Sequence, residues 1–271
     1  MAKPKFLFVT HKIFPYVPVE EPTLGKQMPQ KIASAGYEVR TFMPKFGSVN
    51  ERRNQLHEVI RLSGINIPIN NADHPLVIKV ASLQPSRIQV YFIDNDDYFL
   101  KNDDDEDVIG SNRKDNDERS MYFAHGTADT VKKLKWEPTV VHVSGWIASL
   151  LPLYIRYLYN GDTTFLDAKI VYSVLPGAVT GGVSNEIFRK LKEEGFAEDV
   201  IEKYEGIKAD TDLLHYIAID NADGVIFHTD NPSDKLLALA REKGIPVLMR
   251  QELDEDGKSI TDFYKHLTDE A

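Results

Sequence analysis

The sequence has no cysteine, which excludes disulfide bonds, thiolate metal sites and cysteine nucleophiles. It also has no apolar run long enough to cross a bilayer, and its short apolar start predicts a first strand rather than a signal peptide. Basic residues are outnumbered, with 32 Lys and Arg against 42 Asp and Glu and a net charge of −10. Nucleic acid and anionic membranes both require clustered positive charge. We therefore expect a cytoplasmic protein with neither as a partner.

Several catalytic signatures are missing as well. The loop after the first predicted strand offers only Leu24-Gly25-Lys26, where a dinucleotide site needs three spaced glycines. No Walker A lysine, H-E-x-x-H or G-x-S-x-G motif is present, so NTPase, zinc-protease and serine-hydrolase chemistry have no support. We expect no cofactor and no metal.

What is present is a regular alternation of strands and helices, which is typical of a parallel sheet covered on both faces. The pattern predicts one α/β domain over residues 1–271, a Rossmann-like, doubly wound, mostly parallel sheet in three α/β/α layers. Three β-rich runs without intervening helices, 59–69, 76–82 and 88–93, predict an antiparallel or mixed excursion at the edge of the sheet. The expected strands are 5–10, 37–43, 139–143, 169–174, 224–227 and 246–249, and the expected helices are 24–35, 118–135, one opening near 145, 185–204 with a break near 195, 211–221, 233–243 and 259–267.

A polar stretch dense in acid follows the last of the β-rich runs and includes Asp103–Asp107. An EF-hand would need a glycine and a final glutamate where Val108 and Lys114 stand. The composition therefore predicts a solvated, mobile loop at about residues 100–118 rather than a metal site.

Loops that follow parallel strands are the candidate sites, because ligands bind beyond the carboxyl ends of such strands. His142 and Trp146 stand where strand 139–143 turns into a helix, and they either contact a sugar or simply pack at that junction. Gly181 and Gly182 precede Ser184, which stands where it would cap the next helix. Main-chain N–H groups there would suit an anion, and a flexible connector is the simpler alternative.

Several segments, in the right order, resemble bacterial glycogen and starch synthases. Residues 37–47 resemble the family's G-H-E-V-R-x-x-M-P-R-Y-G, and residues 90–99 resemble V-Y-F-I-D-x-P-x-Y-F. Residues 119–146 are similar to L-K-K-L-G-W-K-P-D-I-I-H-x-H-D-W, and residues 151–173 continue in register. The run 50–64 is similar to the short synthase-like proteins of Bacteroidetes-type bacteria.

The resemblance implies the N-terminal half of a GT-B glycosyltransferase, in which donor ADP-glucose and a glucan acceptor meet between two Rossmann-like domains. It places Tyr98, His142 and Trp146 at the acceptor side of that cleft. It also implies maltooligosaccharide or glucan as a ligand, with ADP-glucose as the candidate donor substrate.

The departures from the family pattern bear on activity. Pro18–Pro22 replaces the family's phosphate-approaching K-x-G-G-L, which puts two carboxylates where glycines are expected. Ser144 and Gly145 replace the second His and the Asp of H-x-H-D-W, and residues 174–176 have lost the His and Asn of H-N-L. The sequence ends at Ala271, before the family's C-terminal domain with its nucleotide cradle and catalytic Glu. We therefore expect a chain that is catalytically incomplete alone, with no catalytic residue of its own to name.

Three functions remain open from the sequence. The first is a glucan-binding or regulatory accessory subunit in glycogen metabolism. The second is an ADP-glucose-dependent α-1,4-glucan synthase completed by self-association or by a partner chain carrying a C-terminal GT-B domain. The third is a protein-interaction module with a degenerate cleft. Binding of maltooligosaccharide separates the first from the third, and glucose transfer identifies the second.

Overall fold

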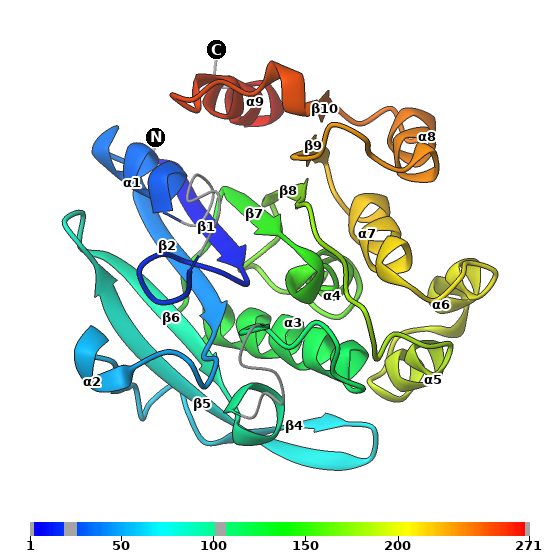
Figure 1. The fold of residues 1–271 in the computed structure, drawn as a ribbon, viewed down its shortest axis with the longest axis horizontal. Helices are drawn as coiled ribbons and strands as arrows, with labels where there is room; N and C mark the ends of the chain where they lie inside the picture. Colours follow the sequence, from blue (N-terminus) through cyan, green and yellow to red (C-terminus); the bar gives the residue numbers. More distant parts are fainter. Residues whose placement is uncertain (1–2, 19–25, 101–106, 269–271) are drawn as a thin grey trace.

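The computed structural model describes residues 3–18, 26–100 and 107–268, and its centre is one mixed sheet (Figure 1). The strand order is β10-β9-β8-β7-β1-β2-β6-β5-β3, and β4 pairs with β5 off this path. All neighbours from β10 to β6 are parallel, whereas β5 is antiparallel to β6, β3 and β4. The strands are β1 Lys5–Thr10, β2 Glu38–Pro44, β3 His57–Glu58, β4 Ile65–Ile69, β5 Ala72–Leu83, β6 Ile88–Asp94, β7 Val140–Ser144, β8 Lys169–Val174, β9 Gly224–Phe227 and β10 Val247–Leu248.

Helices cover both faces of the parallel part (Figure 1). On one face the ring of Tyr264 from α9 packs against Phe6 of β1, with centroids 5.4 Å apart. On the other face His215 of α7 hydrogen-bonds Tyr172 of β8, and α3 packs against α4. The layers are therefore α/β/α, as predicted. The helices are α1 Met28–Ser34, α2 Glu51–Asn54, α3 Asn116–Lys133, α4 Leu151–Tyr157, α5 Glu186–Glu193, α6 Glu198–Glu205, α7 Thr211–Asp220, α8 Asp234–Glu242 and α9 Lys258–Thr268, with a π-helical turn Asp96–Leu100 and 3-10 turns Trp146–Ala148 and Arg250–Glu252.

The central strands are buried on both faces, which explains their nearly continuous apolar sequence. Every residue of β7 and of β9 is buried. The polar side chains buried in these strands include His142 and Ser144 on β7 and Ser173 on β8. These polar side chains lie near the carboxyl ends of the strands and lead to the candidate site.

Most predicted elements are found close to their expected positions. Strands 169–174 and 224–227 begin and end as predicted. The β-rich run predicted over 59–69 is a strand only from Ile65 onward, because residues 60–62 form a turn and Gly64, at φ +85°, precedes β4. The helix predicted from Leu24 begins at Met28, and the first residues of that prediction lie outside the described residues.

The acidic segment differs from the prediction of a solvated loop. Residues 101–106 lie outside the described residues, so most of the run Asp103–Asp107 is not described. The rest packs onto the domain, because Ile109, Asn116 and Asp117 are buried. Among the described residues there is no cluster of three side chains that could hold a metal ion, and no described helix is long and apolar enough to cross a bilayer.

Candidate functional site at the carboxyl edge of the sheet

A pocket of about 200 Å³ lies where three parallel strands end. Because β1, β7 and β8 are neighbours in the sheet, the loops that follow them meet at one edge. A fourth wall comes from the segment just before α3. The lining residues are His11 and Lys12 after β1, Gly145 and Trp146 after β7, Leu175, Pro176, Gly177 and Ala178 after β8, and Ile109 and Ser111 before α3.

His11 and Gly145 form the tightest contact in this pocket. Gly145 has φ +80°, and a Cβ atom at this position would lie 2.1 Å from Nδ1 of His11. Glycine is therefore required both by the backbone and by the imidazole that lies against it. Burial, together with the charge of Lys12, lowers the pKa of His11 to about 3, although a hydrogen bond with the main chain of Ser144 opposes part of this shift. At neutral pH the ring is uncharged, so it suits a hydroxyl group better than a phosphate.

His142 does not reach the pocket. Its Nε2 lies 2.7 Å from Oγ of Ser173, and its Nδ1 pairs with the hydroxyl of Tyr264 on α9. Ser173 Oγ in turn lies 3.2 Å from Nε2 of His228, so the chain of hydrogen bonds continues to the end of β9. Burial, with a smaller contribution from the nearby His228, lowers the pKa of His142 to about 3. Both ring nitrogens already have partners, which corresponds to the packing interpretation of this residue.

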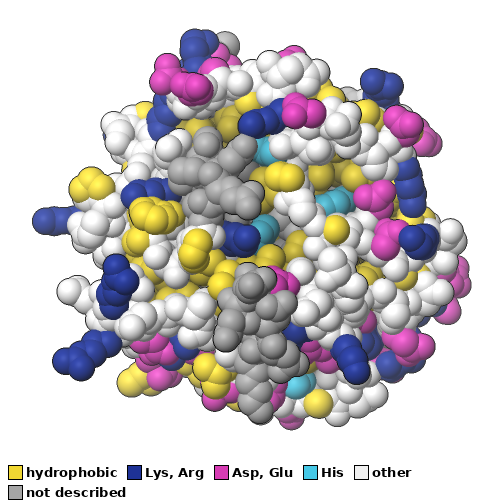
Figure 2. All heavy atoms as spheres, in the orientation of Figure 1, with side chains coloured by type: hydrophobic (Ala, Val, Ile, Leu, Met, Phe, Trp, Pro, Cys, Tyr) yellow, Lys and Arg dark blue, Asp and Glu magenta, His cyan; other side chains and the backbone are white. Residues whose placement is uncertain are grey.

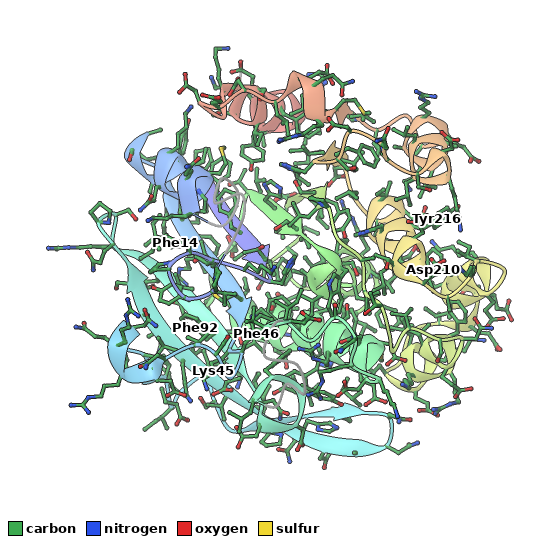
Figure 3. The ribbon with its side chains drawn as sticks, viewed as in Figure 1. Phe14, Lys45, Phe46, Phe92, Asp210 and Tyr216 are labelled. Carbon is green, nitrogen blue, oxygen red and sulfur yellow. The ribbon has the colours of Figure 1, made fainter. Side chains whose placement is uncertain are left out.

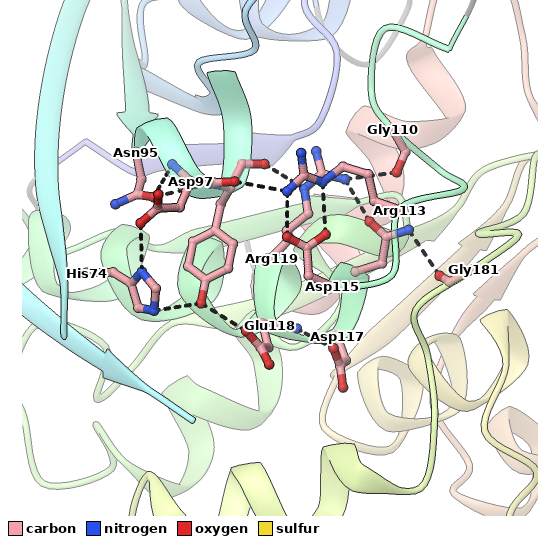
Figure 4. A network of polar contacts seen from close by, with 12 residues as sticks. His74, Asn95, Asp97, Gly110, Arg113, Asp115, Asp117, Glu118, Arg119 and Gly181 are labelled. Carbon is pink, nitrogen blue, oxygen red and sulfur yellow. Dashed lines mark hydrogen bonds and ion pairs between the residues drawn. The ribbon is translucent and has the colours of Figure 1, made fainter. Parts of the chain in front are cut away.

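Tyr98 belongs to a separate polar network between the π-helical turn and α3. Figure 4 shows this network, with His74 and Glu118 labelled. The hydroxyl of Tyr98 is 3.0 Å from Nε2 of His74 and donates to Oε2 of Glu118 at 3.2 Å. Burial, together with the charge of Glu118, raises the pKa of Tyr98. The side chain is 2% exposed and is not among the residues that line the carboxyl-edge pocket. Of the three acceptor-side candidates, Trp146 alone lines it.

Comparison with known sequences identifies the family. The family profile described as "Starch synthase catalytic domain" matches residues 5–227, which is more than half of the chain. This chain belongs to that family. The glycogen synthase of Chlorobium luteolum is 31% identical over 235 residues, covering 86% of this chain and 47% of the relative. The glycogen synthase of Chlorobium limicola is 34% identical over 192 residues, covering 70% of this chain and 39% of the relative.

The fold of this starch synthase family member also matches a solved structure. The catalytic domain of starch synthase IV from Arabidopsis thaliana, bound to ADP and acarbose, superposes with a TM-score of 0.68. Its sequence identity is 13%, and the match covers 92% of this chain and 52% of the other. The predicted Rossmann-like, GT-B type of fold is thus confirmed. The chain spans about half the length of the curated relatives it matches.

The glycines predicted to form an anion loop have another role in this synthase-family chain. A Cβ atom on Gly181 would lie 2.7 Å from the carbonyl oxygen of Asn112, and one on Gly182 would lie 2.3 Å from that of Arg113. The N–H of Gly181 donates to the carbonyl of Ser111 at 3.1 Å, so it already has a protein acceptor. The glycines thus let the loop after β8 approach the segment before α3. This geometry disfavours anion binding by Gly181.

The prediction that Ser184 caps the next helix is wrong, because the N-cap residue of α5 is Asn185, one position further on. The Oγ of Ser184 accepts a hydrogen bond from the N–H of Glu186 at 3.3 Å. The side chain is exposed and does not line the pocket. A role for Ser184 in ligand binding stays a prediction.

Sequence reasoning missed the residues that approach the pocket most closely. His11 directly follows the first strand, and this position was the available signal, because a polar residue at the carboxyl end of a parallel strand faces the ligand edge. Lys12 is half-buried beside it and lines the same wall. Ile109 and Ser111 carried no comparable signal, since they belong to the segment expected to be a solvated loop.

Proposed function

We propose that this chain binds the end of an α-glucan at the carboxyl-edge pocket and acts as an accessory subunit in glycogen metabolism, without transferring glucose by itself. Its family membership supports a glucan as the ligand, since its curated relatives are named glycogen synthases. The structural relative was solved bound to ADP and acarbose. The pocket is below the roughly 300–1,000 Å³ of drug-sized sites, so it suits a terminal sugar unit rather than a nucleotide sugar.

One observation carries the second half of this proposal. Among the described residues that line the pocket, Lys12 is the one cationic side chain and none is a carboxylate. Transfer from a sugar nucleotide relies on fixed positive charge to stabilise the departing diphosphate. His11 does not add to that charge, because burial lowers its pKa to about 3. The lining therefore favours binding of a neutral sugar over catalysis.

Calorimetry of the purified chain against maltoheptaose, with ADP-glucose titrated separately, tests the proposal. We expect heat with maltoheptaose and none with ADP-glucose. The exposed Ala178 lines the pocket, and a phenylalanine there fills it without entering the core. Ala178→Phe should weaken maltoheptaose binding at least tenfold, whereas Thr180→Phe, an exposed neighbour outside the lining, should change it less than twofold. No heat with maltoheptaose would refute glucan binding.

A second candidate function rests on the length comparison. The match covers 47% of the Chlorobium luteolum glycogen synthase, so that synthase contains a further half without a counterpart in this match. If another polypeptide supplies that half, the chain is part of an ADP-glucose-dependent α-1,4-glucan synthase. Labelled glucose entering glycogen when the two are mixed would establish this function and refute the accessory role.

A further inference from the structure

A larger hollow lies away from the carboxyl-edge pocket, beside α2 and the antiparallel end of the sheet. Its volume is about 650 Å³, within the range of small-molecule sites. We term it the α2 groove. Its lining comes from β5 and the turn after it (Ala81, Ser82 and Gln84), from the end of α2 and the start of β3 (Arg53, Asn54, Gln55 and His57), and from the connection between β1 and α1 (Pro15, Tyr16 and Lys26).

The α2 groove is basic although the whole chain carries a net charge of −10. Lys26 and Arg53 bring two positive charges, and none of its described lining residues is acidic. Among the described residues neither cation pairs with a carboxylate; the Lys26 ammonium lies over the exposed ring of Phe14, 4.7 Å from its centroid. Figure 2 shows Lys and Arg side chains along the margin where Figure 1 places α2. Two cations that pair with no carboxylate of the described residues, both beside one hollow, indicate an anionic ligand.

The backbone that carries Arg53 is firmly held. The side chain of Asn50 caps α2 by accepting from the N–H of Arg53 at 2.8 Å. Glu51 anchors the same helix to the sheet through Lys79 at 2.7 Å and Lys45 at 2.9 Å. Lys45 comes from the end of β2 (Figure 3) and is itself buried. A guanidinium projecting from a backbone that is already fixed loses less entropy when it binds a phosphate or carboxylate.

The uncharged part of the groove suits a ligand rich in hydroxyl groups. The ring of Tyr16 is buried and packs edge-on against Phe92, with centroids 5.0 Å apart. Burial raises the pKa of Tyr16 to about 12, so its hydroxyl keeps its proton and can donate. The amides of Asn54, Gln55 and Gln84 line the groove beside it and can both donate and accept. Amide and phenol groups of this kind recognise sugar hydroxyls.

We propose that the α2 groove binds a small phosphate ester of a sugar, with its phosphate on Arg53 and Lys26 and its hydroxyl groups on the amides and Tyr16. A phosphate matches the planar guanidinium better than a single carboxylate does, because Arg can donate two parallel hydrogen bonds to it. The site shares no lining residue with the carboxyl-edge pocket. Binding of a sugar phosphate in the α2 groove is therefore independent of the proposed glucan binding, and either proposal can fail while the other holds.

Calorimetry of the full chain tests this proposal with four probes titrated separately: glucose 1-phosphate, glucose 6-phosphate, inorganic phosphate and glucose. We expect at least one hexose phosphate to bind at least tenfold more tightly than inorganic phosphate or glucose, and its affinity to fall as salt is raised. No heat with either hexose phosphate at millimolar concentration would overturn the proposal. Equal affinity for inorganic phosphate would overturn it too, since the sugar would then not be recognised.

Variants locate the binding. Arg53→Gln and Lys26→Gln should each weaken the hexose phosphate at least tenfold. Arg52→Gln is the matched control, because Arg52 is an exposed neighbour on the same short helix that does not line the groove. The affinity of the Arg52→Gln variant for the hexose phosphate should stay within twofold of that of the parent chain. An equal loss of affinity in the Arg52 and Arg53 variants would show that the hexose phosphate is attracted diffusely to the charged surface. That result would overturn the proposed site.

Discussion

Gly145 shows how one residue sets the chemistry of the carboxyl-edge pocket. The resemblance to glycogen and starch synthases puts an aspartate at this position, where this chain has glycine at φ +80°. The missing side chain leaves room for the imidazole of His11, which takes up the space. A carboxylate of the family motif is thus replaced by a neutral ring from the loop after β1.

Restoring the family residue by Gly145→Asp should therefore destabilise the fold. The positive φ and the overlap with His11 should together cost about 2–4 kcal/mol in the free energy of unfolding. Denaturant unfolding measures this loss. Gly161→Asp is the control, because Gly161 is exposed and a Cβ atom there would have nothing within 4 Å. Equal stability of the two variants would contradict the close His11 contact.

At the scale of elements, a buried arginine on α3 holds the segment that closes the pocket. The guanidinium of Arg119 donates to the carbonyl oxygens of Tyr98, Ile109 and Gly110 at 2.8–3.0 Å. Figure 4 shows Arg119 and Gly110 in this network. The guanidinium also donates to Oδ1 of Asn116 at 2.7 Å and lies over the ring of Phe99. Burial lowers the pKa of Arg119 to about 10, so it remains charged at neutral pH. One side chain thus ties the π-helical turn and the segment at residues 109–110 to α3.

Replacing this residue by Arg119→Met should leave buried carbonyls without donors and lower the free energy of unfolding by about 3 kcal/mol or more. Hydrogen exchange should speed up at the N–H groups of Gly110 and Arg113, which hydrogen-bond within the segment. Lys132→Met on the same helix is the control, since its exposed ion pair with Asp162 contributes less than about 1 kcal/mol. Unchanged exchange in the Arg119 variant would show that the segment is held by other contacts.

At the scale of the whole molecule, several neutral histidines lie in the sheet or pack against it. Burial lowers the pKa of His142 to about 3 and that of both His215 and His228 to about 4. His142 lies on β7, His215 on α7 and His228 just after β9. His142 contacts α9 in one helical layer, and His215 belongs to the other layer. Each folded-state pKa lies below the unfolded value near 6.5, so the unfolded chain binds more protons between these values.

Stability should therefore fall as the pH drops from about 6.5 towards 4, by up to about 1.4 kcal/mol per pH unit for each of these histidines. Denaturant midpoints from pH 7.5 to 4.5 measure this slope. His215→Asn should make the slope shallower, because one such group is removed. His57→Asn, at an exposed position, should leave it as in the parent chain. The same slope in both variants would contradict the burial of His215.

Much of the architecture could be predicted from the sequence, because it depends on local patterns. Apolar runs such as Lys169–Val174 predict buried parallel strands, and glycines at helix ends mark where each element stops. The carboxyl edge of the sheet follows from the alternation of strands and helices. The sequence by itself thus determined the layers, the family and the loops that form the candidate site.

Only the tertiary structure decided which side chains face the pocket. His142 is covered by α9, through a contact with Tyr264 separated by 122 residues in the chain. His11 lies in the pocket because Gly145, just after the neighbouring strand β7, leaves room for it. The hydrophobic period and the composition of a segment predict which element that segment forms. The exposure of a side chain depends instead on which other parts of the chain pack over it. That is why the loops of the site could be predicted and the side chains that line it could not.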